Sequence, residues 1–111
     1  MEITTEICRG ILVVRISGEF DMHSTDNFKS IIDDYLVQAN LKDIVINMTK
    51  LTFIDSSGIG ALLGRYKKVS GMGGKLVLCA VAEPVKKILS LSGLLEIINL
   101  YEDEAAALAC L

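Results

Sequence analysis

Residues 44–60 read IVINMTKLTFIDSSGIG, and this stretch decides the fold of the chain. It opens with an apolar run, Ile44 to Met48, and continues through Leu51 to Ile54. A run that leaves no room for a solvated face is typical of a strand buried on both sides, as in parallel sheets. From Ile59 onward the apolar residues recur every three or four positions, which indicates a helix. The stretch therefore predicts a buried strand that leads directly into a helix.

The junction between this strand and this helix reads Asp55-Ser56-Ser57-Gly58-Ile59-Gly60. The first N–H groups of a helix have no partner within it, and the helix dipole favours negative charge there. A serine hydroxyl in this place can cap the helix or can accept a phosphoryl group. The residues alone leave both interpretations open.

The rest of the chain alternates between strand and helix patterns. Arg9-Gly10 is a plausible hairpin turn between the first two strands. Later strands alternate with helices, which implies parallel pairing and right-handed crossovers. Strands are expected at 3–7, 11–17, 44–48, 75–81 and 97–100, and helices begin near Ser24 or Thr25, after Asp55, at Pro84 and at Asp103. We expect an α/β fold of order ββαβαβαβα, with a mixed, mostly parallel β-sheet, a leading β-hairpin, and helices packed on the sheet.

The composition is that of one domain, 1–111, with 51% hydrophobic residues and a mean hydropathy of +0.48. No run approaches the roughly 18 apolar residues of a membrane-spanning helix. The N-terminal segment, Met1 to Glu6, is unlike a signal or transit peptide. Three cysteines, Cys8, Cys79 and Cys110, form no pairing framework, and Cys79 lies in a buried apolar run. We therefore expect a reducing, cytoplasmic location.

Charge and motif spacing argue against several functions. The net charge of −3 does not suit a nucleic-acid surface. No group of residues has metal-ligand spacing, and no cofactor motif is complete. Gly58-Ile59-Gly60 lacks the third glycine of a dinucleotide fingerprint at the right distance. The glycines of Gly71-Met72-Gly73-Gly74-Lys75 end a helix and precede a strand, which reverses the order of a phosphate-binding loop.

A small serine hydrolase or nucleotide-processing enzyme is the alternative from a different functional class. Ser57 would need His23, the only histidine, as its base, and Asp21 or Asp55 as the third member of a triad. The Gly-x-Ser-x-Gly elbow is absent around Ser56 and Ser57. A triad would require Ser57, His23 and one of these aspartates to come together in the fold although no motif links them. The sequence therefore does not favour an enzyme.

Two carboxylates, Asp21 and Asp55, each follow the end of a strand-like run. Loops at the carboxyl ends of parallel strands meet at one rim of a sheet. We therefore expect Asp21 to share a surface with the turn from Asp55 to Gly58, while stabilisation of a turn is an equally good interpretation of Asp21. Asp33 and Asp34 lie within an expected helix and are interpreted as part of its solvated face.

The segment Phe53 to Lys67, FIDSSGIGALLGRYK, resembles the signature of the anti-sigma factor antagonists of the STAS domain family. Ser17 to Asp21 and Ser92 to Ile98 resemble two other segments of that family, so the likeness extends over essentially the whole chain. The Gly-Arg-Tyr-Lys ending is closest to the family's sporulation member. The resemblance implies the STAS fold and a regulatory protein with no catalysis of its own.

The resemblance also implies partner switching. In the family, the serine directly before the glycine accepts a phosphoryl group, and here that residue is Ser57. The matching aspartate, Asp21, lies near the phosphoacceptor and helps to engage the partner, an anti-sigma factor that is also a serine kinase. The unphosphorylated antagonist binds this partner and frees the sigma factor. Phosphorylation with ATP ends the binding, and a serine phosphatase restores it.

We also expect the partner-binding surface to include four more residues of the junction: Asp55, Ser56, Gly58 and Ile59. Ser56 is interpreted as structural, in line with the preference of serine for capping positions. Gly58 is interpreted as leaving room for the partner's active site. Phe20 and Met22, beside Asp21, differ from other members of the family, which leaves partner selectivity open. The alternative within the same class is an antagonist of a general stress pathway, with the same residues in the same roles.

Overall fold

The structure is a computed structural model that describes residues 1–111, and its elements follow the expected order. The strands are β1 (Glu2–Cys8), β2 (Ile11–Phe20), β3 (Ile44–Ile54), β4 (Leu76–Cys79) and β5 (Leu100–Tyr101). The helices are α1 (Thr25–Gln38), α2 (Ser56–Gly71), α3 (Glu83–Leu91) and α4 (Glu104–Ala109), with a short 3-10 helix, η1 (Leu94–Glu96). None of the helices combines the length and the apolar character that a membrane crossing requires.

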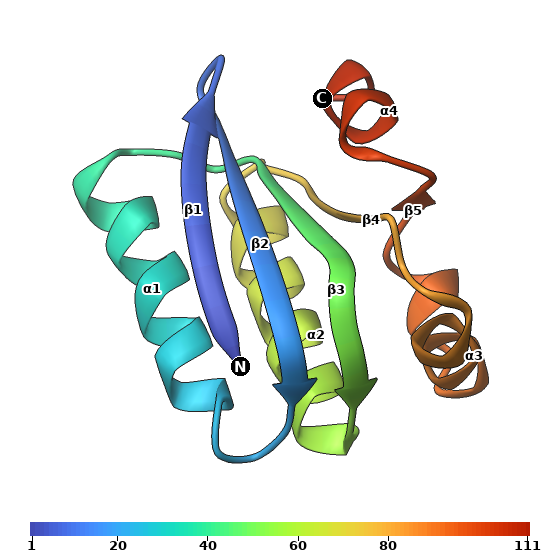
Figure 1. The fold of residues 1–111 in the computed structure, drawn as a ribbon. Coiled ribbons are helices and arrows are strands. Elements are labelled where there is room, and N and C mark those ends of the chain that lie inside the picture. Colours follow the sequence, from blue (N-terminus) through green and yellow to red (C-terminus); the bar gives the residue numbers. More distant parts are fainter.

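The strands form one five-stranded sheet in the order β1-β2-β3-β4-β5 (Figure 1). β1 and β2 pair antiparallel, and every other neighbouring pair is parallel. Arg9 and Gly10 form the hairpin turn with φ values of 52° and 78°. Two successive positive φ angles are what a two-residue hairpin needs to match the twist of its strands. The mixed, mostly parallel sheet expected from the sequence is confirmed.

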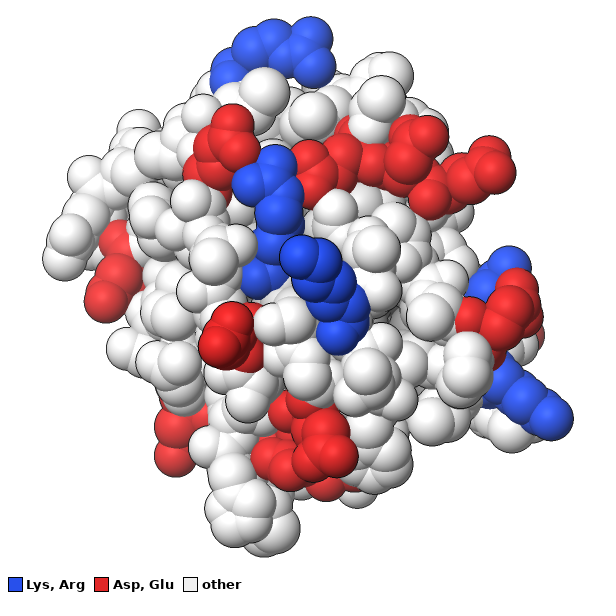
Figure 2. Space-filling view, viewed as in Figure 1, with Lys and Arg blue, Asp and Glu red and all other residues white.

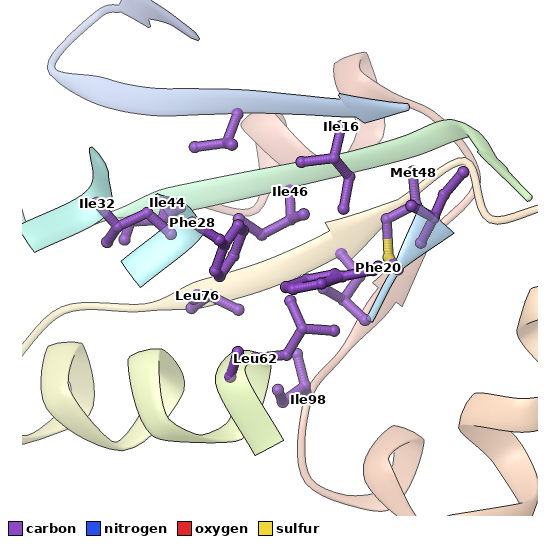
Figure 3. Packing of buried hydrophobic residues seen from close by; sticks show 14 of the residues in the cluster. Ile16, Phe20, Phe28, Ile32, Ile44, Ile46, Met48, Leu62, Leu76 and Ile98 are labelled. Carbon is purple, nitrogen blue, oxygen red and sulfur yellow. The ribbon is translucent and has the colours of Figure 1, made fainter. Parts of the chain in front are cut away.

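Helices cover the two faces of this sheet unequally. α1, α2 and α3 pack on one face, where the main core contains 21 buried residues (Figure 3). Leu12, Val14 and Ile16 of β2 point into this core, because alternate residues of a strand share a face. On the opposite face α4 covers one part of the sheet, where it buries a smaller cluster made up of Ile11, Val13, Val45, Val77, Cys79 and Ala107. Polar side chains that include Thr4, Ser17 and Thr49 line an open pocket on the rest of that face.

Several expected strand boundaries differ in the structure. β3 runs on to Ile54, and β4 covers only Leu76–Cys79 of the range 75–81. β2 does not end at Ser17 but continues to Phe20, because its last residues still pair with β3 across two irregularities in register. The edge strand expected at 97–100 is wrong for most of its length, since β5 is only Leu100–Tyr101. The N–H groups of Ile97 and Ile98 both donate to the carbonyl of Leu94, so a helical turn continues there. That turn buries Ile98 in the main core, which an extended strand would not do.

Candidate functional site

Asp55 is the residue that joins β3 to α2, and its side chain caps the helix. Asp55 has extended dihedral angles (φ −108°, ψ −174°), and its carboxylate Oδ1 accepts a hydrogen bond of 3.1 Å from the N–H of Gly58. Ser56 already belongs to the helix, so the expectation that Ser56 caps it is wrong. An N-cap must be the last non-helical residue, and aspartate fills that position as well as serine does.

Capping by Asp55 leaves both serine hydroxyls without a hydrogen-bond partner in the protein. Ser56 and Ser57 are the first two residues of α2, where the N–H groups have no acceptor within the helix. The side chain of Ser56 is exposed, and that of Ser57 is half-buried. The Ser57 hydroxyl therefore lies at the positive end of the helix dipole and is free to react.

Gly58 is buried, and its lack of a side chain serves packing inside the molecule. A Cβ atom on Gly58 would lie 2.7 Å from the carbonyl oxygen of Phe20 and 2.8 Å from Cγ1 of Ile54. Only glycine lets the first turn of α2 approach the ends of β2 and β3 this closely. Packing inside the molecule is thus sufficient to require glycine here, and the expected contact of Gly58 with a partner stays a prediction.

Asp21 and Asp55 lie at the same rim of the sheet, as expected from the sequence. Phe20 and Ile54 are partners in the β2–β3 register, and the N–H of Asp55 donates to the carbonyl of Phe20 at 3.1 Å. The two aspartates therefore follow directly on a pair of neighbouring strand residues. Asp21 also stabilises its own turn, because its Oδ1 accepts a 3.0 Å hydrogen bond from the N–H of His23.

The rim carries negative charge that no basic residue neutralises. Glu19, Asp21 and Asp55, which we call the acidic rim, take part in none of the ion pairs of the structure. Acidic atoms gather where β2 and β3 end, at the lower edge of the molecule in Figure 2. Ile59, one turn into α2, is half-buried against the main core. The surface around Ser57 is therefore acidic, with an apolar layer beneath it.

The site has no enclosed cavity and no catalytic triad. None of the cavities of the molecule is lined by Ser57, Asp21 or Asp55. His23 is exposed in the loop after β2, and no hydrogen bond joins its imidazole to Ser57 or to a carboxylate. No group of three or more potential ligands could hold a metal ion. An open rim of this kind suits a protein partner better than a small substrate.

No pattern in the sequence indicated the ion pair that joins Asp33 of α1 to Arg65 of α2. Asp33, interpreted as part of a solvated face, accepts two hydrogen bonds of 2.6 Å from Nη1 of Arg65 and lies 3.0 Å from Nζ of Lys68. Asp33 and Arg65 are 32 residues apart, so no local pattern could reveal their contact. The pair fixes the helix that carries Ser57 against its neighbour.

The fold and the site together define a class: an α/β binding domain that presents a free serine hydroxyl at a helix N-terminus beside an acidic rim. The STAS domain family model matches residues 2–107, and the chain belongs to this family. The family resemblance seen in the sequence is thereby confirmed.

Similar proteins agree with this family. The chain is 40% identical over 108 residues to the anti-sigma F factor antagonist of Paenibacillus polymyxa, which covers 97% of this chain and 92% of that protein. The structure of the anti-sigma factor antagonist SpoIIAA in its unphosphorylated form matches with a TM-score of 0.85 at 28% identity, covering 98% of this chain and 95% of that one. The phosphorylated form of SpoIIAA from Bacillus matches with a TM-score of 0.76 at 27% identity, covering 98% of both chains.

Proposed function

We propose that this chain is an anti-sigma factor antagonist whose binding to its partner is switched by phosphorylation of Ser57. One observation carries the proposal: Asp55 caps α2, so the half-buried Ser57 hydroxyl is left unbonded at the helix N-terminus. The relative named anti-sigma F factor antagonist supports the class of function, since the likeness covers 97% of this chain. The existence of a phosphorylated form of SpoIIAA supports the switch.

The partner in this proposal is an anti-sigma factor that is also a serine kinase. In the unphosphorylated state the rim binds this partner through Asp21, Asp55, Ser56 and Ile59, and the sigma factor is released. The partner then uses ATP to phosphorylate Ser57 and dissociates, and a serine phosphatase restores the free hydroxyl. Gly58 contributes by setting the position of the helix. Residues 1–111 act as a single domain in the cytoplasm, where the transcription machinery is found.

The charge of the rim accounts for how one phosphoryl group could end partner binding in this proposal. Phosphorylation adds about −1.5 to −2 charges and three strong acceptor oxygens. The unbonded N–H groups and the dipole of α2 favour that charge, so the fold tolerates it. On the surface, however, the phosphate joins Asp21 and Asp55 and repels a partner groove shaped for a neutral hydroxyl. Each tenfold loss of affinity needs only about 1.4 kcal/mol.

The first test is to map the phosphorylation site. The purified chain is incubated with the partner kinase and ATP, and the modified residue is located by mass spectrometry. We expect one phosphoryl group on Ser57, none on Ser57→Ala, and normal modification of the control Ser70→Ala, whose exposed serine lies near the other end of α2. Label on Ser56 or on the neighbouring Thr52 would overturn the assignment.

The second test measures binding. The unmodified chain, the phosphorylated chain and Ser57→Asp are each titrated with the partner kinase in a calorimeter. We expect a loss of affinity of at least about tenfold on phosphorylation, while circular dichroism shows that the fold is retained. Equal affinity of the two forms would contradict the switch. Preferential binding to a kinase of a general stress pathway would instead assign the chain to that pathway.

A further inference from the structure

The apolar part of the second face of the sheet is covered by one short C-terminal segment. Residues 103–111, which we call the clasp, contain the six-residue helix α4. Beneath the clasp lie five almost completely buried residues of three strands, which we call the apolar strip: Ile11, Val13, Val45, Val77 and Cys79. Figure 1 shows α4 on its own at the end of the chain, apart from α1 and α2.

Glu104 attaches the clasp to the sheet. Its carboxylate accepts hydrogen bonds from Nε and Nη2 of Arg15 on β2, at 2.7 and 2.9 Å. Nδ2 of Asn47 on β3 donates to the same carboxylate at 2.5 Å. Arg15 is held in place from the other side by Glu6 of β1 at 2.9 Å. One acidic side chain thus links the clasp to the middle of the sheet.

Apart from Glu104, the clasp buries little apolar surface against the sheet. Ala107 is the only fully buried residue of α4, and Leu108 and Leu111 are partly exposed. Asp103 caps the helix through the N–H of Ala106 at 2.8 Å, yet so short a helix is marginal without tertiary contacts. The main core lies on the other face and includes no residue of the clasp. Segments with few buried apolar contacts open locally at a lower free energy than the whole domain.

We propose that the clasp opens as a unit, under the control of Glu104, and uncovers the apolar strip while the main core and the rim around Ser57 stay folded. The opening frees the Arg15 guanidinium from Glu104 and exposes Cys79 together with the branched side chains of the strip.

Cys79 is a reporter of this opening. It is completely buried in the strip, and burial raises the pKa of its thiol to about 12. Only a thiolate reacts quickly with an alkylating reagent, so Cys79 is inert while the clasp is closed. Cys8 and Cys110 are partly exposed and pack against the edge of the same cluster, so their labelling reports the opening as well, from a closed state that is already partly accessible.

The test is residue-resolved thiol labelling of the full chain. The wild type, Glu104→Gln and the matched control Glu102→Gln are treated with N-ethylmaleimide at several low urea concentrations, and mass spectrometry gives the labelling rate of each cysteine. Glu102 is exposed and takes part in no ion pair. Arg15→Gln, which removes the other side of the contact, is the second variant. Amide hydrogen exchange in α2 reports whether the main core is intact.

We expect Glu104→Gln and Arg15→Gln to raise the labelling rate of Cys79 by about tenfold or more, the effect of losing a charge-assisted hydrogen bond. Glu102→Gln should change it by no more than about twofold. In the wild type the rate should depend weakly on urea, because local opening exposes little surface. A urea dependence as steep as that of global unfolding, or loss of α2 protection in step with Cys79 labelling, would overturn the proposal. The assay needs neither kinase nor ATP, so its outcome is independent of the switch at Ser57.

Discussion

Asp55 shows how one side chain decides the chemistry available to its neighbours. By capping α2 through Gly58, the carboxylate removes the need for either serine to cap the helix. The same residue bonds through its N–H to Phe20, which holds the β2–α1 loop beside the serine pair. A residue that would pass as an extra charge on the rim therefore positions Ser57 and keeps its hydroxyl free.

Replacing Asp55 should separate its role as a cap from its charge. Asp55→Ala removes the acceptor for the Gly58 N–H, so we expect the free energy of unfolding to fall by about 1 kcal/mol. Asp55→Asn keeps a capping oxygen and should lose much less. Urea denaturation of the three proteins at neutral pH measures both effects. Equal losses for alanine and asparagine would show that the charge, and not the cap, stabilises the helix.

The glycines of α2 offer a second comparison at the scale of single residues. Gly58→Ala places a Cβ atom 2.7 Å from the Phe20 carbonyl oxygen, so we expect destabilisation of about 1–3 kcal/mol. A Cβ at Gly60 would meet no atom within 4 Å. Gly60→Ala should therefore stabilise the chain by up to about 1 kcal/mol, the helix propensity of alanine over glycine. Thermal unfolding of both variants tests the contrast, and a stabilising Gly58→Ala would contradict the packing described for this turn.

Between elements, α1 and α2 are joined by charge as well as by apolar packing. Arg65 is largely buried, with 15% of its side chain exposed, and its Nη1 binds both carboxylate oxygens of Asp33. Its Nε has no hydrogen-bond partner. Because Arg65 lies on the helix that carries Ser57, this contact sets how α2 rests against α1.

Asp33→Asn should destabilise the packing of α1 on α2. It leaves the mostly buried guanidinium of Arg65 without its counter-charge, so we expect a loss of about 1–2 kcal/mol, reduced because Asp33 is partly exposed. Asp34→Asn is the matched control, since Asp34 is exposed and unpaired. Chemical denaturation gives both values. A similar loss for the two variants would mean that general helix charge matters here and the specific pair does not.

At the scale of the whole molecule, the sheet joins two unlike halves. One face supports three helices, the main core and the rim with Ser57, and the other carries only α4 and the charged contact of Glu104. Hydrogen bonds from Arg15 and Asn47 hold the pKa of Glu104 below its ordinary value, and the desolvation that opposes this is the smaller effect. The stability of the second face should therefore depend on pH.

The sign of this dependence follows from the lowered pKa. In the unfolded chain Glu104 binds a proton near its ordinary pKa of 4.5, and in the folded chain only at lower pH. The contribution of Glu104 to stability is therefore complete above the unfolded-state pKa of 4.5, and it is lost as the pH falls through the lower pKa of the folded state. We expect the difference in unfolding free energy between the wild type and Glu104→Gln to be constant near neutral pH and to shrink in acid. Unfolding curves recorded from pH 7 to pH 3 test this, and a difference that grows in acid would have the wrong sign.

Much of the fold was predictable because it follows from short-range patterns. The continuous apolar run at 44–48 predicted a strand buried on both sides, and Arg9-Gly10 predicted the hairpin turn. Apolar runs were a less reliable guide where a short segment can bury its side chains in a helical turn instead of a strand. The segment around Ile98 looks like a strand, but a helical turn from Leu94 carries this side chain into the core. The rim shared by Asp21 and Asp55 was predictable for the same reason as the fold, since it follows from parallel pairing.

The sequence by itself determined the order of the elements, the parallel sheet and the place of the serine pair at a helix start, because periodicity and turn residues act over a few positions. The tertiary structure alone decided that Asp55 is the cap, that Gly58 faces Phe20, that Arg65 binds Asp33, and that one short helix buries the apolar strip of the second face. Each of these depends on contacts between residues far apart in the chain or on where the backbone leaves the strand. Ser57 was a candidate from its place in the chain, but its hydroxyl is free because a neighbouring carboxylate satisfies the helix.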